Sequence, residues 1–328
     1  MWKYSSCAVQ GKAHVQHQIP CQDKTKTVFE NHTYVIALAD GAGSARLSHF
    51  GAERTVNAIS EFFVSEFDRL FMAEDGRLVK VAIMEKLLAE IKEEAKIHDC
   101  DMKDLASTLL AVAVKEDQYI IVHIGDGVIG YLDGEQLKIA SAPSNGEHAN
   151  ETYFVTSKDA INVMRLFKGH LKEIAGFVLM SDGTEHSLYN KRNNTLSTAV
   201  MKLMQRDVLV DETSMNTQLE TTFKNVIAEQ THDDCSIALL AKHSPSLRKV
   251  NELSFAEKCE LYKISGNTKA LENRIERYEK ILEILQNPCS CTVVSKKLFL
   301  KPKHTRRHLE YLYQNGLLKK RDGIYYLE

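Results

Sequence analysis

The chain has 328 residues, and its 42 Lys and Arg nearly balance its 44 Asp and Glu, for a formal net charge of −2. With 44% hydrophobic and 26% charged residues, the composition excludes a collagen-like or wholly disordered chain and a uniformly basic nucleic-acid binder. The charge is unevenly distributed, because residues 1–244 carry 25 basic and 34 acidic side chains (−9), whereas residues 245–328 carry 17 and 10 (+7). This contrast predicts two modules with different partners.

The sequence contains no run of about 18 apolar residues, so we expect neither a membrane span nor a membrane partner. Its first residues, MWKYSSCAVQ, lack the apolar core of a signal peptide. The seven cysteines are scattered and odd in number, which argues against a disulfide framework. These features together predict a cytoplasmic protein.

Short apolar runs and amphipathic stretches alternate along the first three-quarters of the chain. The predicted strands, each bounded by turn residues, cover 33–39, 109–114, 119–124, 128–132, 177–180 and 236–241. The predicted helices cover about 49–72, 78–98, 157–168 and 194–205. We therefore expect a body of mixed α and β structure over residues 1–243.

The pattern changes after the last of these strands. Residues 242–249 contain proline and polar side chains, so we expect a linker at 244–270 and a second domain at 271–328. Helices are predicted over 271–286, 292–300 and 302–315, followed by a hairpin around Asp322-Gly323. Three helices and a terminal hairpin in this order predict a small winged helix-turn-helix domain.

Asp-Gly pairs occur six times, and those at Asp75, Asp133 and Asp322 are expected to be simple turns. Asp40 and Asp182 differ, because each ends an apolar strand, where a buried acid is costly unless it is paired or binds a metal. Asp233 and Asp234 precede another such strand, and Asp23 lies shortly before the strand that ends at Asp40. Oxygen ligands at several strand ends favour a hard cation such as Mg²⁺ or Mn²⁺.

Seven segments carry a family resemblance. They are GKAHVQHQIPCQDKT (11–25), ALADGAGSA (37–45), ASTLLAV (106–112), HIGDGVIGYLDG (123–134), GEHANETYFVT (146–156), LMSDGTEHSL (179–188) and HDDCSIALL (232–240). In this order they resemble the metal-dependent protein serine/threonine phosphatases of type 2C (PPM), in particular a bacterial branch. The resemblance spans roughly residues 5–241.

This resemblance implies an α+β fold, a four-layer αββα sandwich of two antiparallel sheets flanked by helices. It also implies a binuclear Mn²⁺ or Mg²⁺ site, with two ions or three, at one end of the sandwich. The metal ligands that it implies are Asp23, Asp40, Gly41 through its carbonyl, Asp126, Asp182 and Asp233. Asp233 is preferred to Asp234 because it stands three residues before Ser236, as the metal-binding aspartate does before the serine of the family motif, and Asp234 is then expected to be a supporting or capping acid.

The implied reaction is hydrolysis of phosphoserine or phosphothreonine in proteins by a metal-activated water, with no phosphoenzyme. The implied catalytic residues are Asp40, Asp182, Asp233 and His14. Two departures stand out. Many family members have an arginine in this region that binds the substrate phosphate, but residues 11–22 contain none. His14 is therefore expected near the phosphate, or else it is a surface histidine. Ala42 stands where some members have a histidine that protonates the leaving group.

A Ser/Thr kinase that the phosphatase opposes is an expected partner. The basic tail, with Lys301, Lys303, Arg306 and Arg307 on its third helix, suits either DNA or a protein partner. The alternative function is a regulatory winged-helix factor, binding DNA or protein, in which the phosphatase body is a sensor.

Overall fold

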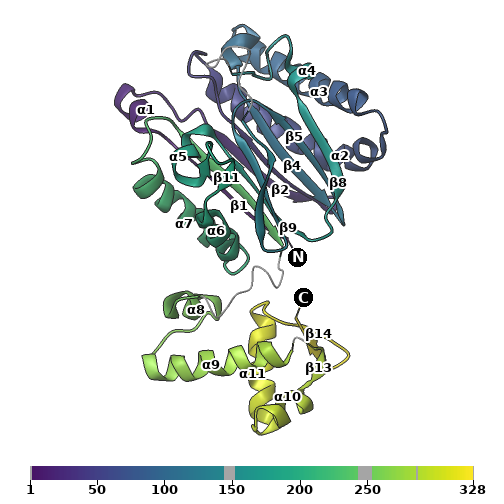
Figure 1. Ribbon diagram of the computed structural model, residues 1–328, viewed down its shortest axis with the longest axis vertical. Helices are drawn as coiled ribbons and strands as arrows, with labels where there is room; N and C mark the ends of the chain where they lie inside the picture. Colours follow the sequence, from purple (N-terminus) through teal and green to yellow (C-terminus); the bar gives the residue numbers. More distant parts are fainter. Residues whose placement is uncertain (1, 144–151, 243–252, 286, 328) are drawn as a thin grey trace. The chain divides into compact units, whose positions relative to one another are not determined.

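The computed structural model describes residues 2–143, 152–242, 253–285 and 287–327 (Figure 1). The chain divides into two compact units, a large unit of Trp2–Lys242 and a small unit that covers His243–Glu328. Among the described helices, none is both long and apolar enough to cross a membrane.

Two five-stranded antiparallel sheets form the centre of the large unit. The first runs in the order β2 (Lys24–Glu30), β3 (Thr33–Ala39), β4 (Leu109–Lys115), β5 (Gln118–Ile124) and β8 (Arg165–His170). The second runs in the order β1 (Trp2–Val9), β12 (Cys235–Lys242), β9 (Ile174–Met180), β6 (Val128–Asp133) and β7 (Gln136–Ser141).

Helices cover the outer faces of both sheets (Figure 1). The long helices α2 (Ser48–Met72) and α3 (Gly76–Ile97) belong to the first sheet, and α6 (Thr198–Asp207) and α7 (Glu212–Thr222) to the second. In β3, Val35 and Ala37 pack in the core under α2 and α3, while Ile36 packs in the core between the sheets. Because alternate side chains point to opposite faces, this double burial explains the continuous apolar run of β3. The αββα sandwich is therefore confirmed.

Shorter elements complete the large unit: α1 (Lys12–His17), the 3-10 helices η1 (Met102–Leu105) and η2 (Asp182–Thr184), α4 (Ala160–Val163), α5 (Glu185–Leu188), β10 (Tyr189–Asn190), β11 (Thr195–Leu196) and the π-helical turn η3 (Phe223–Ile227). The helix predicted over 157–168 is wrong beyond Val163. There the chain forms the edge strand β8, in which Leu166 packs on the core and Phe167 is exposed.

The small unit contains α8 (Phe255–Leu261), α9 (Thr268–Ile284), α10 (Cys291–Lys297), α11 (Pro302–Gln314) and a three-stranded sheet of β13 (Cys289–Ser290), β15 (Ile324–Tyr326) and β14 (Lys319–Arg321). Buried Tyr278 of α9 stacks on Tyr311 of α11 at 5.8 Å between ring centroids. The core therefore joins these two helices.

The predicted linker at 244–270 needs a correction. Residues 243–252 lie outside the described part of the chain, but α8 and the first turn of α9 fall inside the predicted linker. Ser254 and Glu257 explain the start of α8, because each side chain bonds the main-chain N–H of the other, at 3.3 and 2.8 Å. This reciprocal Ser-x-x-Glu capping box fixes the first turn of α8.

Candidate metal centre

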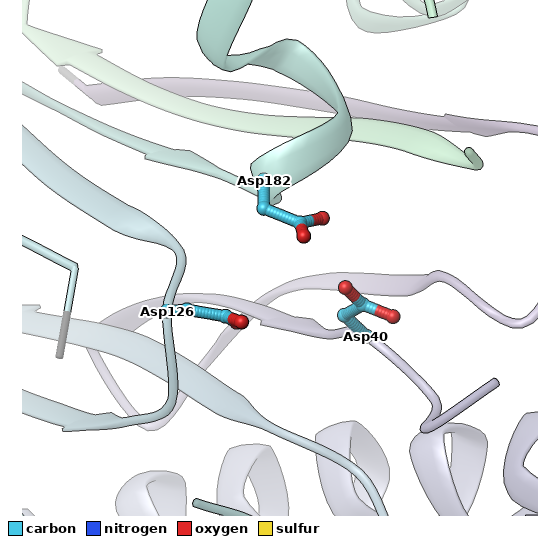
Figure 2. A group of neighbouring side chains, drawn as sticks. All are labelled: Asp40, Asp126 and Asp182. Atoms are coloured by element: carbon cyan, nitrogen blue, oxygen red, sulfur yellow. The ribbon is translucent and has the colours of Figure 1, made fainter. Parts of the chain in front are cut away.

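Three aspartates converge where the ends of the two sheets meet. Asp40 follows β3, Asp126 lies between β5 and β6, and Asp182 follows β9 and opens η2. One carboxylate oxygen from each lies within 4.8 Å of the other two. Figure 2 shows the Asp182 side chain projecting toward the other two from the opposite side of the site. We call this group the aspartate triad.

Neighbouring strands hold the first Asp-Gly pair in place. The Asp40 N–H donates to Thr108 Oγ1 at 2.9 Å, and the Thr108 N–H donates to the Asp40 carbonyl at 2.8 Å. Gly41 forms a β-bridge with Ser107, and a Cβ at Gly41 would lie 2.9 Å from Ser48. The Ser-Thr pair of the ASTLLAV segment therefore positions Asp40, and the close contact explains the glycine after it.

The second Asp-Gly pair packs against the strand that starts at Cys235. A Cβ at Gly183 would lie 1.9 Å from the carbonyl oxygen of Asp234, so only glycine fits. The Ser236 N–H donates to Ser181 Oγ at 3.0 Å, which joins the end of β9 to the start of β12. This close packing brings Asp182 beside the Asp233-Asp234 pair.

The electrostatics of the triad favour a cation. Burial raises the pKa of Asp40 well above its ordinary value, and the negative charges of Asp23, Asp182, Asp233 and Asp126 raise it further. Such a group of carboxylates is stable only when protons or cations offset the repulsion. Because all the donors are carboxylate oxygens, the residues fit a hard divalent cation such as Mn²⁺ or Mg²⁺.

Asp23 lies beside the triad but is not part of it. It is 1% exposed, and burial raises its pKa to about 7. Its Oδ2 accepts a hydrogen bond from Ser236 Oγ at 2.7 Å, while its buried Oδ1 has no hydrogen-bond partner in the described structure. Oδ1 is thus the oxygen that remains for a cation.

Asp126 is held by a residue that motif spacing does not reveal. Thr152 Oγ1 donates to Asp126 Oδ2 at 2.5 Å. Thr152 belongs to the segment 146–156, of which residues 146–151 lie outside the described part of the chain. The hydrogen bond gives this segment a contact with the triad.

The two aspartates at 233 and 234 have opposite environments. Asp233 is exposed, and its Oδ1 accepts the Asp234 N–H at 2.9 Å. Asp234 is 2% exposed, and its two oxygens accept the main-chain N–H groups of Gly11 and Gln22, each at 2.6 Å. Asp234 therefore ties two remote loops to the start of β12, and Asp233 stays accessible.

The structure places His14 against Asp234. His14 lies on α1, its Nδ1 is 2.9 Å from Asp234 Oδ1, and its side chain is 14% exposed. Lys12, another cation of this segment, pairs instead with Glu229 at 2.6 Å. The buried Asp234 carboxylate therefore lies against the one residue of this segment that is expected near the phosphate.

A pair that the sequence does not indicate, buried His123 and partly buried Arg165, lies against Gly125, the residue before Asp126. Arg165 Nη2 lies 3.0 Å from Nδ1 of His123, which has no exposed surface. Burial lowers the pKa of His123 well below its ordinary value, and the charge of Arg165 lowers it further. Arg165 also donates to the Gly125 carbonyl at 3.5 Å. Because Arg165 falls in the wrongly predicted helix, no pattern in the sequence points to this pair.

Comparisons with known proteins agree with this geometry. The model of the family described as Protein phosphatase 2C matches residues 10–224. The chain is 26% identical over 204 residues to Serine/threonine-protein phosphatase 3 of Escherichia coli (strain K12), covering 59% of this chain and 78% of that protein.

Solved structures share the fold. The serine/threonine phosphatase Stp1 from Staphylococcus aureus matches 74% of this chain and 96% of its own, with a TM-score of 0.51 and 14% identity. The catalytic domain of the serine/threonine protein phosphatase PstP, in complex with two manganese ions, matches 73% and 97%, with a TM-score of 0.50 and 14% identity. At such identities the likeness concerns the fold alone.

Proposed function

Since the chain belongs to the protein phosphatase 2C family, we propose that its large unit hydrolyses phosphoserine and phosphothreonine in proteins at the aspartate triad. The chain is a metal-dependent protein serine/threonine phosphatase, and the proposal concerns which residues do the work. The observation that carries it is the convergence of Asp40, Asp126 and Asp182 within the segment that matches the family.

The proposed cofactor is Mn²⁺ or Mg²⁺, as two ions with a weaker third. Asp40 and the Gly41 carbonyl would be shared ligands, and Asp23, Asp126, Asp182 and Asp233 would complete the sites. When bound, the ions would supply Lewis-acid activation of water and neutralise charge on the phosphate. Support comes from the all-oxygen donor set and from the manganese ions of the PstP structure.

The protein itself would orient these groups and the substrate. Thr108 and Ser107 hold the backbone at Asp40 and Gly41, so the shared ligands need little rearrangement when a cation binds. His14 is proposed to bind a phosphate oxygen in place of the missing arginine. Because its Nδ1 faces Asp234, its Nε2 is the atom that would reach the phosphate.

The test is the Asp40→Asn variant, assayed for phosphate release from a phosphothreonine peptide with Mn²⁺. We expect activity to fall to background, because the shared ligand loses its charge. The matched control is Asp75→Asn, another Asp-Gly aspartate, which only caps α3 and whose capping bond an asparagine can replace. Full activity in Asp40→Asn would contradict the proposal.

We place the protein in the cytoplasm, where it would oppose a Ser/Thr kinase. All seven cysteines are free thiols, which suits a reducing compartment. The substrate chemistry requires such a kinase, since phosphoserine and phosphothreonine must first be made by phosphoryl transfer to a hydroxyl. The alternative, a regulatory winged-helix factor in which this body is a sensor, is not favoured, because Asp40, Asp126 and Asp182 come together as a candidate metal site.

A further inference from the structure

The small unit contains a long segment without any negative charge. Residues 287–309 hold six Lys and Arg and two His but no Asp or Glu. The segment covers α10, the turn after it and the first half of α11. Its six cations are Lys296, Lys297, Lys301, Lys303, Arg306 and Arg307. We call these six side chains the basic surface.

Every member of the basic surface is exposed, and none forms an ion pair with a residue that the structure describes. Other cations of the same unit behave differently. Lys258 pairs with Glu279 at 2.7 Å, and Lys280 pairs with Glu276 at 2.6 Å. The six positive charges are therefore available to an external partner.

Three other basic residues of the small unit, Lys320, His308 and Arg277, contact residues within the unit. Lys320 of β14 pairs with Glu310 at 2.6 Å. His308 is half-buried with its ring 5.7 Å from that of Tyr278, and Arg277 approaches it to 3.3 Å. Burial lowers the pKa of His308, and the charges of Arg277, Arg274 and Arg307 lower it further. The electrostatic potential around the imidazole of His308 is therefore positive.

The fold presents the cations outward along one helix. Thr305, Leu309 and Leu312 are the buried positions of α11, and their spacing of four and three residues places them on one side. Leu309 and Leu312 have no exposed surface, so this side anchors the helix in the core. Lys303, Arg306 and Arg307 fall on the remaining sides of α11, which Figure 1 shows crossing the unit beside α10.

We infer that the basic surface binds the phosphate backbone of double-stranded nucleic acid, with α11 as the element that enters a groove. A helix of 13 residues is about 20 Å long and 10–12 Å wide, which matches a major groove about 12 Å wide. Lys and Arg on the helix and on the preceding α10 can then contact phosphates on its edges.

The composition of the surface favours this partner over an acidic protein. The cores of protein–protein interfaces are poor in charged residues, lysine above all, and rich in aromatic and other apolar ones. Here four of the six side chains are lysines. The most exposed large apolar side chain of this cationic segment is Phe299, which lies in the turn between α10 and α11 and is 95% exposed. With Val293 as the other exposed large apolar side chain of the segment, six cations surround two separate apolar groups, so charge dominates this surface.

The experiment measures binding of the full chain to a fluorescent 20-base-pair duplex of arbitrary sequence, across a series of KCl concentrations. Six phosphate contacts predict a slope of log K against log salt of about −5 at most. Arg306→Ala combined with Arg307→Ala should weaken binding about tenfold or more and make the slope shallower by about 2. This double variant should keep the phosphatase activity of the unaltered chain.

The matched control is Lys269→Ala combined with Lys280→Ala, which removes the same charge from exposed positions on α9. It should leave affinity and slope nearly unchanged. No binding at low salt would overturn the inference. So would equal losses in both double variants, or binding of a polyglutamate peptide in preference to the duplex. Because none of these residues belongs to the metal centre, failure here leaves the proposed phosphatase function untouched.

Discussion

Replacing each of the two neighbouring aspartates at 233 and 234 by asparagine should give two different defects, because Asp233 is a proposed metal ligand, whereas Asp234 holds main-chain groups and lies against His14. The buried Asp234 carboxylate accepts two main-chain N–H groups at 2.6 Å, one on each oxygen. An asparagine has one acceptor oxygen, and its amide group cannot accept a hydrogen bond. One of the two buried N–H groups, that of Gly11 or that of Gln22, must therefore lose its partner.

The size of the effect follows from that loss. A buried donor without a partner costs about 1–3 kcal/mol, and bonds to a charged acceptor fall in the upper part of this range. We therefore expect Asp234→Asn to lower the free energy of unfolding by about 2–3 kcal/mol. For a unit of this size that corresponds to a melting temperature lower by roughly 4–12 °C. Exposed Asp233→Asn should change stability by less than about 0.5 kcal/mol and instead abolish metal-dependent activity.

The assay can address the large unit alone. Trp2 is the single tryptophan of the chain, lies in β1 and stacks on Phe177 with ring centroids 6.4 Å apart. Its fluorescence during urea unfolding therefore reports this unit and not the small one. The reasoning would be refuted if Asp234→Asn left the urea midpoint unchanged, or if Asp233→Asn retained full Mn²⁺-dependent activity.

Three further predictions concern the same unit. Thr152→Val removes the hydrogen bond to Asp126, so about 10–100-fold more Mn²⁺ should be needed for half-maximal activity. Thr152→Ser keeps the hydroxyl and should need the same Mn²⁺ concentration as the unaltered chain. An unchanged Mn²⁺ requirement in Thr152→Val would count against the role of Thr152 in holding Asp126. Gly183→Ala places a Cβ 1.9 Å from the Asp234 carbonyl oxygen, so the free energy of unfolding should fall by at least about 1–3 kcal/mol, and an unchanged urea midpoint would contradict the packing. Burial raises the pKa of Asp207 to about 7, so its protonated form stabilises the fold and that stability is lost as pH rises from about 4 through 7. Asp207→Asn should flatten the fall in stability between about pH 4 and 7, and an unchanged slope would show that other groups cause it.

The central strands and the helices beside them could be predicted because their signals are local. In β3 and β9 both faces are buried, so a continuous apolar run marks each strand, and the Asp-Gly pair marks its end. The edge strand β8 could not be predicted in the same way. It pairs with a neighbour on one side only, and its sequence RLFKGH has a mixed burial that a short helix could share.

Local sequence signals likewise predict only part of the metal centre. Asp40 and Asp182 stand out in the sequence, yet the orientation of Asp234 depends on N–H groups 223 and 212 residues away along the chain. No spacing rule connects these positions, because only the folded sandwich brings their loops together. The contact between His14 and Asp234 arises for the same reason, and so does the hydrogen bond from Thr152 to Asp126.

The most direct test of the central claim is a calorimetric titration of the full chain with Mn²⁺, compared with Asp40→Asn. If the aspartate triad holds the catalytic cations, the unaltered chain should bind at least two ions and Asp40→Asn should lose the tighter binding. Trp2 fluorescence would verify that the variant remains folded. Equal stoichiometry and affinity in the two proteins would contradict the assignment of the metal centre.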